Sequence, residues 1–263
     1  MSEPISKRWT FEELKIAFYL YCQIPFGKIH ARNEEIIKLA AILSRTPSSV
    51  SMKLANFASL DPAIRDSGRA GLANASALDK RVWDEFHENW ESLSVESYET
   101  FQRLSTVSID NQADLTQAKL QSFELDDFSG ETKQVITQQR VKQYIFRKSV
   151  LSSYHERCCI SGIDEPKFLI ASHIIPWGID KKNRLNPSNG LCLSVLHDRA
   201  FDKGFITVNS DFTLEVSTAM NKSRNDFLQR NIVAYQSKRI ELPERFIPDS
   251  AFLAWHKANV FLC

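Results

Sequence analysis

Two neighbouring stretches decide the fold of this chain: FLIASHIIPW at residues 168–177 and NGLCLSVLHDRAFDKG at residues 189–204. The first predicts a short strand that ends at His173 and leads into a basic loop. The second predicts another strand and then a helix that carries His197 and ends at Gly204. The expected order is therefore strand, long loop, strand and helix, with a histidine on the first strand and another on the helix.

Further residues around these stretches complete an ordered series of motifs. They are Gln143, Phe146, Arg147, Tyr154, the run Arg157–Gly162, the run Ser172–Trp177, the run Asn189–Leu191, His197, Phe201, Asp202 and Gly204. In this order they resemble the HNH endonuclease family, specifically the subfamily found in bacterial restriction-type endonucleases. The resemblance covers residues 139–208 and implies a ββα-metal nuclease fold.

The chemistry of the family explains these residue types. Hydrolysis of a phosphodiester needs a base that deprotonates water and a cation that stabilises charge on the phosphate and the leaving oxygen. The resemblance implies that His173 is the general base and that Asn189 holds the loop and the imidazole in place. It also implies that His197 binds a divalent metal ion, for which we expect Mg²⁺, with Mn²⁺ as the alternative.

One position departs from the family pattern. Many members carry an aspartate as a metal ligand directly before the catalytic histidine, where this chain has Ser172. A neutral hydroxyl binds divalent cations poorly, so the second ligand must be water or another residue. Asp202 is our candidate ligand and Asp198 the alternative, although either carboxylate could instead cap the helix or pair with Arg147.

The cysteines give no metal-binding pattern. The five cysteines are an odd number and form no C-x-x-C pair, so neither a disulfide framework nor a structural zinc site is expected. Cys158, Cys159 and Cys192 are interpreted as small apolar packing residues.

A second pattern lies near the N-terminus. Amphipathic helices are predicted at 9–23, 33–43 and 47–57, with Thr10, Asn33 and Thr46 as their N-caps. The tight turn before the third is typical of a helix-turn-helix, whose last helix enters the major groove of DNA. The opening Trp9-Thr10 also resembles Myb/SANT domains. The alternative is a helical domain that binds protein or is purely structural.

Seven side chains are predicted to contact DNA, because cationic groups pair with phosphates and an asparagine can pair with adenine. They are Arg45, Lys53 and Asn56 in the N-terminal helices, and Arg147, Lys181, Lys182 and Arg184 around the nuclease cleft.

Charge is unevenly distributed along the chain, although its net value is only +1. The net charge is +4 over residues 1–83, −10 over residues 84–132 and +8 over residues 133–240. Two basic blocks fit a nucleic-acid partner, whereas solvated faces would give the same totals. The acidic block could also screen the basic blocks from each other until DNA displaces it.

These observations predict an α+β protein in three parts. They are an all-helical, helix-turn-helix-like DNA-binding module at 1–92, an acidic and polar linker at 93–132, and the HNH nuclease domain at 133–263. Outside the motifs we expect an acidic helix at 79–92, a partial helix at 112–121, a basic helix at 139–154, a hairpin at 205–216 and a final helix at 249–261. His256 on that final helix is interpreted as structural.

No stretch approaches the ~18 consecutive apolar residues that span a membrane, and the polar residues 1–8 do not form a signal peptide. We therefore expect a cytoplasmic protein without membrane contact. The predicted function is metal-dependent DNA cleavage of the restriction or defence type. One HNH unit nicks one strand, so double-strand cleavage needs a homodimer or two successive events.

Two alternatives remain open. The first is a DNA-binding regulator with an inactive nuclease fold, for which Ser172 is the best support. The second, a nuclease toxin, is disfavoured because the sequence carries no secretion signal.

Overall fold

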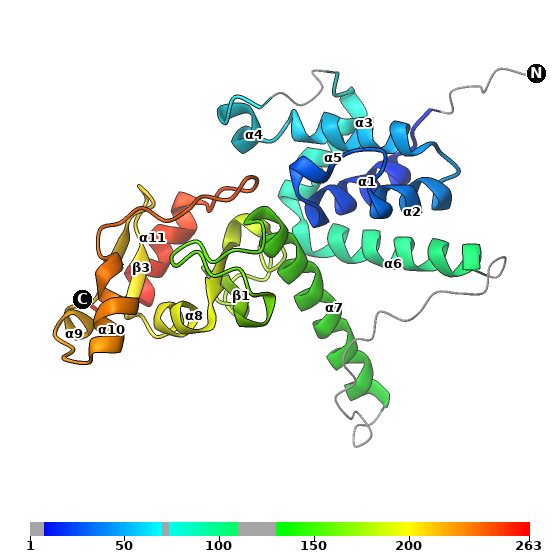
Figure 1. Ribbon diagram of the computed structural model, residues 1–263. Helices are drawn as coiled ribbons and strands as arrows, with labels where there is room; N and C mark the ends of the chain where they lie inside the picture. Colours follow the sequence, from blue (N-terminus) through cyan, green and yellow to red (C-terminus); the bar gives the residue numbers. More distant parts are fainter. Residues whose placement is uncertain (1–7, 70–73, 110–129) are drawn as a thin grey trace, which may run out of the picture.

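The computed structural model describes residues 8–69, 74–109 and 130–263 of the chain (Figure 1). Most elements are helices, and two small antiparallel sheets make the fold α+β, as predicted. The partial helix predicted at 112–121 lies outside the described residues. No helix in the described part of the chain is both long and apolar enough to cross a membrane.

The N-terminal helices form where their capping residues predict. They are α1 (Phe11–Gln23), α2 (Glu34–Ile42), α3 (Pro47–Ala58), α4 (Pro62–Asp66), α5 (Ala77–Glu88) and α6 (Trp90–Ile109). A 3-10 turn, η1 (Phe26–Lys28), follows α1. The Thr10 side chain accepts a hydrogen bond from the Glu13 amide, and the Glu13 carboxylate accepts one from the Thr10 amide. Asn33 and Thr46 cap α2 and α3 through their side chains, so all three predicted caps are confirmed.

Helix α6 differs from the expectation for this part of the chain. The single helix predicted at 79–92 is two helices, because the backbone turns at Asn89 (φ −149°, ψ 66°). Helix α6 then continues to Ile109, so the first part of the segment interpreted as a linker is helical. Its partly buried apolar residues pack against α1, where the rings of Tyr98 and Tyr19 lie 6.2 Å apart. The polar composition of the segment hid this apolar stripe.

The second half of the chain is built on the long helix α7 (Gly130–Ser153), which begins earlier than predicted. Strands β1 (Leu169–His173) and β2 (Gly190–Ser194) pair antiparallel, with His173 opposite Gly190. Helix α7 packs on both strands, and α8 (Val195–Asp202) also packs against them. The predicted strand, loop, strand and helix are therefore confirmed.

The remaining elements surround this unit (Figure 1). They are η2 (Pro166–Phe168), η3 (Pro187–Asn189), β3 (Ile206–Val208), β4 (Leu214–Val216), α9 (Thr218–Asn221), α10 (Asp226–Asn231), η4 (Val233–Tyr235) and α11 (Ser250–Asn259). Strands β3 and β4 form the predicted hairpin, and α11 is the predicted final helix.

Two glycines are required by the packing. A Cβ atom at Gly190 would lie 2.9 Å from Cζ of Phe146 and would overlap Cγ2 of Val150, so α7 can approach β2 only without a side chain there. Gly204 has φ +70° and lies against the backbone of Val260. It ends α8 in a conformation that favours glycine.

The N-terminal helices and the C-terminal half share one hydrophobic core. Arg245, which is fully buried, joins them: its guanidinium donates to the backbone oxygen of Tyr21 in α1 and to the hydroxyl of Ser152 in α7. It also lies over the Tyr21 ring, 4.8 Å from its centroid. The two halves are therefore packed together rather than only tethered by the segment between α6 and α7.

Candidate active site

His173 ends β1, and its imidazole lies between α7 and the loop after the strand. Its Nε2 atom is 2.9 Å from the backbone oxygen of Arg184. Because a carbonyl oxygen can only accept, Nε2 carries the proton and Nδ1 keeps a lone pair. Burial lowers the pKa of His173, although the Arg184 carbonyl opposes this. The imidazole is therefore neutral near pH 7 and able to accept a proton.

Aromatic rings hold the imidazole from two sides. It stacks on Phe146 of α7, with ring centroids 3.7 Å apart, and meets Trp177 edge-on at 5.5 Å. These three residues, with Arg147 and neighbouring positions of β1, line a cavity of about 270 Å³. A phosphate group that entered this cavity would lie beside the imidazole.

Asn189 is buried at the end of the loop between the strands, and its side chain binds the start and the middle of that loop. Its side-chain oxygen accepts a hydrogen bond from the Ile175 amide at 2.8 Å. Its side-chain nitrogen donates to the backbone oxygens of Ile175 and Asn183. These three hydrogen bonds would hold the loop in place beside the strands, which is the role predicted for Asn189. The Arg184 carbonyl, however, orients the imidazole of His173 directly, whereas Asn189 acts on it only through the loop.

His197 lies in the first turn of α8 and is only 2% exposed. Its Nε2 atom is 2.8 Å from the backbone oxygen of Asn231 and therefore donates a hydrogen bond. Its Nδ1 atom is 2.8 Å from the hydroxyl of Ser194 and 3.8 Å from the sulfur of Cys158. A metal ion needs a free lone pair on nitrogen, and both ring nitrogens are engaged in these contacts; metal binding by His197 stays a prediction.

Ser172, next to His173 on β1, points to the opposite face of the strand. Burial raises the pKa of Asp198 on α8; the Ser172 hydroxyl opposes this rise and the Asp202 carboxylate adds to it. Burial also raises the pKa of Asp202, against the effect of Arg199 and Lys203. The effect of Ser172 on the pKa of Asp198 indicates that Asp198 lies near Ser172, although no hydrogen bond joins the two side chains.

The fit to a divalent cation is limited to these two carboxylates. In residues 8–69, 74–109 and 130–263, no group of three or more His, Cys, Asp or Glu side chains is arranged to hold a metal ion. Two carboxylates on one face of α8 nevertheless match the usual Mg²⁺ site, which takes one or two carboxylates and completes its shell with water and substrate phosphates.

Comparison with known proteins identifies this unit. Residues 158–209 match the family model of HNH endonucleases. This segment is an HNH endonuclease domain. The match contains β1, β2, α8 and β3, and therefore both histidines and Asn189. No curated protein matches the chain. The HNH domain supports nuclease activity, a hydrolase reaction, and enzymes with this domain generally use a divalent metal ion.

In the N-terminal helices, two of the predicted DNA contacts are engaged within the chain. Arg45 lies over the Trp9 ring, 4.0 Å from its centroid, and pairs with Glu13 at 2.7 Å. Lys53 pairs with the fully buried Asp79 at 2.9 Å. Both cations therefore stabilise the helices. Asn56 lies on α3 and is partly exposed.

The four predicted DNA contacts in the C-terminal half are of two kinds. Arg147 donates to the neutral backbone oxygens of Leu169 and Pro166 and forms no ion pair with a described residue. Arg184 donates to the Trp177 carbonyl and lies 3.9 Å from Glu91 of α6. Lys181 and Lys182, in contrast, are exposed on the loop between β1 and β2, where they line a surface pocket with glutamates of α6, and they form no ion pair with a described residue.

Glu91 also pairs with Lys142 of α7 at 2.6 Å. An acidic residue of α6 thus lies against cations beside the HNH domain. This contact agrees with the expectation that the acidic block faces the basic ones; its displacement by DNA stays a prediction.

The sequence did not assign a role to the aromatic partners of His173. Phe146 was part of the motif series and Trp177 followed the histidine closely, so both carried a signal, but nothing in their spacing indicated ring contacts. The Arg184 carbonyl is a backbone atom and leaves no sequence signal at all.

Proposed function

We propose that this protein is a divalent-metal-dependent endonuclease of a restriction or defence system, which hydrolyses phosphodiester bonds in DNA with His173 as the general base. The observation that carries the proposal is the state of the His173 imidazole within an HNH domain. Its proton is held at Nε2 by the Arg184 carbonyl, and its second nitrogen keeps a lone pair.

The neighbouring groups suit this reaction. The lowered pKa keeps His173 unprotonated at neutral pH, so Nδ1 takes a proton from the water that attacks phosphorus. The stacked Phe146 ring fixes the plane of the imidazole. Arg147 lines the same cavity with an uncompensated charge, which favours the binding of a phosphate.

Asp198 and Asp202 would hold the metal ion, with Mg²⁺ as the expected ion and Mn²⁺ as the alternative. The bound cation stabilises negative charge on the phosphate and the leaving oxygen. Binding of a cation would also relieve the repulsion between the two carboxylates, which contributes to the raised pKa of Asp198. His197 instead positions α8 through its bonds to Ser194 and Asn231.

A second candidate is a DNA-binding regulator with an inactive nuclease fold. The neutral Ser172 and the fully engaged His197 favour it, because both reduce the number of metal ligands. The two candidates differ in one property: the regulator binds DNA and leaves it intact.

A plasmid-nicking assay tests the proposal. The purified protein is incubated with supercoiled plasmid and Mg²⁺, Mn²⁺ or EDTA, and DNA affinity is measured in parallel. We expect nicked circles with either metal and none with EDTA. Nicked circles should appear before linear DNA, unless a homodimer cuts both strands together.

The His173→Ala variant should cut at least ~100-fold more slowly, the scale expected for loss of a general base, with DNA affinity within a few-fold of the unsubstituted protein. His30→Ala, which removes an exposed histidine of the N-terminal region, is the matched control and should cut normally. DNA binding without cleavage under every metal condition would support the regulator, and full activity of His173→Ala would exclude His173 as the base.

A further inference from the structure

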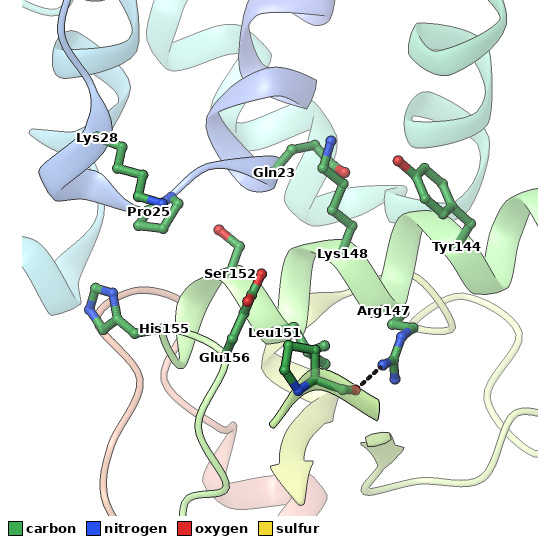
Figure 2. Close-up of a pocket in the computed structure, with 11 residues that line it drawn as sticks. Gln23, Pro25, Lys28, Tyr144, Arg147, Lys148, Leu151, Ser152, His155 and Glu156 are labelled. Atoms are coloured by element: carbon green, nitrogen blue, oxygen red, sulfur yellow. Dashed lines mark hydrogen bonds between the residues drawn. The ribbon is translucent and has the colours of Figure 1, made fainter. Parts of the chain in front are cut away.

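A second cavity, of about 510 Å³, lies between the end of α1 and the side of α7 (Figure 2). Gln23, Pro25 and Lys28 approach it from α1 and the turn after it. Tyr144, Arg147 and Lys148 approach it from α7. Its volume lies within the ~300–1,000 Å³ of typical ligand sites. Its walls come from both halves of the chain.

The cavity is positively charged. Three cations line it, Lys28, Arg147 and Lys148, against the single carboxylate of Glu156. Neither Lys28 nor Lys148 forms an ion pair with any described residue, and the bonds of Arg147 to carbonyl oxygens leave its charge uncompensated. His155, also at the wall, pairs with Glu244 at 3.3 Å. A phosphate group in this cavity could therefore pair with Lys28 and Lys148 without displacing a carboxylate of the described residues from either lysine.

A buried polar atom in the same wall lacks a partner. Gln23 is 4% exposed, and its side-chain nitrogen lies 2.9 Å from the hydroxyl of Ser149. Its side-chain oxygen has no hydrogen-bond partner among the described residues. An unsatisfied buried acceptor is costly, so a ligand with an N–H or O–H donor would be stabilised there. A phosphodiester has no such donor, whereas a nucleobase can supply one.

The remaining features fit a nucleotide. Lys148 extends from α7 toward Gln23, so a phosphate and a base bound to these two groups would be near each other (Figure 2). The Tyr144 ring, 44% exposed, stands at the wall, with the Lys148 ammonium 6.0 Å from its centroid. A base can stack on the face of the ring that Lys148 leaves open.

Arg147 connects this cavity to the active site, because it lines both the 510 Å³ cavity and the cavity of His173. A strand whose scissile phosphate lies at His173 would therefore continue past Arg147 along α7. The second cavity is placed to receive a nucleotide beside the one that is cut.

We propose that this cavity is a nucleotide-binding site, with the phosphate at Lys28 and Lys148 and the base at Gln23. The nucleotide belongs to the substrate strand or is free in solution. The substrate-strand source rests on the proposed nuclease function, and the test separates the two sources.

Binding is measured with the full chain in EDTA, where no cleavage occurs. One arm uses fluorescence anisotropy with a labelled 20-base-pair duplex and a labelled 20-nucleotide single strand; the other uses calorimetric titration with dAMP and ATP. The variants are the double substitution Lys28→Ala with Lys148→Ala, and Gln23→Leu. The control is Lys80→Ala with Lys222→Ala, which removes two exposed lysines outside the cavity.

We expect the Lys28/Lys148 variant to bind its ligand at least ~10-fold more weakly, while the control changes affinity less than ~2-fold. Weaker binding of the labelled DNA, without binding of dAMP or ATP to the unsubstituted protein, identifies the substrate strand as the source. Binding of dAMP or ATP that the variant loses identifies a free nucleotide. Gln23→Leu should lower the affinity for the same ligand at least ~3-fold.

Equal affinities of the Lys28/Lys148 variant and its control, for every probe, would overturn the proposal. The lysine variant carries this decision because both side chains can be shortened without opening the core, so a folding defect of Gln23→Leu does not obscure the result. The assay needs no cleavage, so an inactive enzyme would refute the proposed nuclease function and leave this test unaffected.

Discussion

The imidazole of His173 stacks on the ring of Phe146, with centroids 3.7 Å apart and 13° between the planes. Phe146 belongs to α7 and lies outside residues 158–209, which match the HNH family. The helix can come this close because Gly190 has no side chain. Helix α7 is therefore part of the active site, although the matched domain does not include it.

Replacement of Phe146 by leucine tests whether ring stacking positions the His173 imidazole. The substitution keeps an apolar side chain in the core but removes the flat surface that fixes the imidazole plane. We expect kcat for plasmid nicking to fall by about 10-fold, because small misplacements of a catalytic group are expensive, while KM changes little. Ile145→Val, a conservative change at the adjacent buried position, is the control. A Phe146→Leu enzyme with normal kcat would show that stacking does not position His173.

The Mg²⁺ concentration that nicking requires should depend on Asp198 and Asp202 of α8, the proposed metal ligands. Asp198→Asn should raise the Mg²⁺ concentration for half-maximal nicking by at least ~10-fold, because hard divalent ions prefer anionic oxygen ligands. Asp202→Asn should act in the same direction, and Ser172→Asp should lower that concentration if the loop accepts a carboxylate. Metal titrations of nicking rates measure all three.

His197→Ala should behave differently, since its nitrogens bind Asn231 and Ser194. We expect a loss of folding stability of about 2 kcal/mol, from unsatisfied buried groups, seen in urea denaturation. For the two aspartate substitutions on α8, Asp226→Asn on the exposed α10 is the control for the loss of one negative charge. An unchanged Mg²⁺ requirement in Asp198→Asn and Asp202→Asn would contradict the proposed ligands.

The engaged and the exposed lysines should differ in their effects. Lys53→Ala leaves Asp79 buried without its cation, so we expect a stability loss of about 3 kcal/mol. Lys181→Ala with Lys182→Ala should leave stability within ~0.5 kcal/mol but weaken DNA binding and flatten its salt dependence by about one unit of slope per lost contact. Urea denaturation and salt-dependent anisotropy check both, with Lys80→Ala as the control. Normal stability of Lys53→Ala would mean that its ion pair contributes nothing.

His256 should make folding stability sensitive to pH. Burial lowers its pKa from 6.5 to about 4, against the effect of the Phe201 carbonyl. The unfolded chain therefore binds a proton before the folded one does, so stability is full above pH 6.5 and is lost as pH falls toward 4. The loss reaches about 3 kcal/mol.

Urea denaturation between pH 7.5 and 4.5 measures how steeply the free energy of unfolding changes with pH. His256→Phe should be less stable at pH 7.5, because the Thr207 hydroxyl, 2.9 Å from Nδ1, loses its partner. It should also show a flatter dependence on pH than the unsubstituted protein. Identical slopes in the two proteins would exclude His256 as their source.

The sequence by itself determined the elements that depend on local pattern. The capping box at Thr10, the strands on either side of the basic loop, and the end of α8 at Gly204 all formed as predicted. Each depends on residues a few positions apart, whose hydrogen bonds and backbone conformations are set locally. The ordered series of motifs from Gln143 to Gly204, which includes His173, Asn189 and His197, pointed to the HNH family.

Only the tertiary structure decided what those side chains meet. His197 contacts Asn231, 34 positions away, and this contact engages one of the two nitrogens that the sequence had left available for a metal ion. Glu91 meets Arg184 across the two halves of the chain. The chain stays helical beyond residue 92 because the apolar stripe of α6 packs against α1. A residue type and its spacing indicate which chemistry is available, whereas folding decides which lone pairs, charges and surfaces remain free after distant segments have packed.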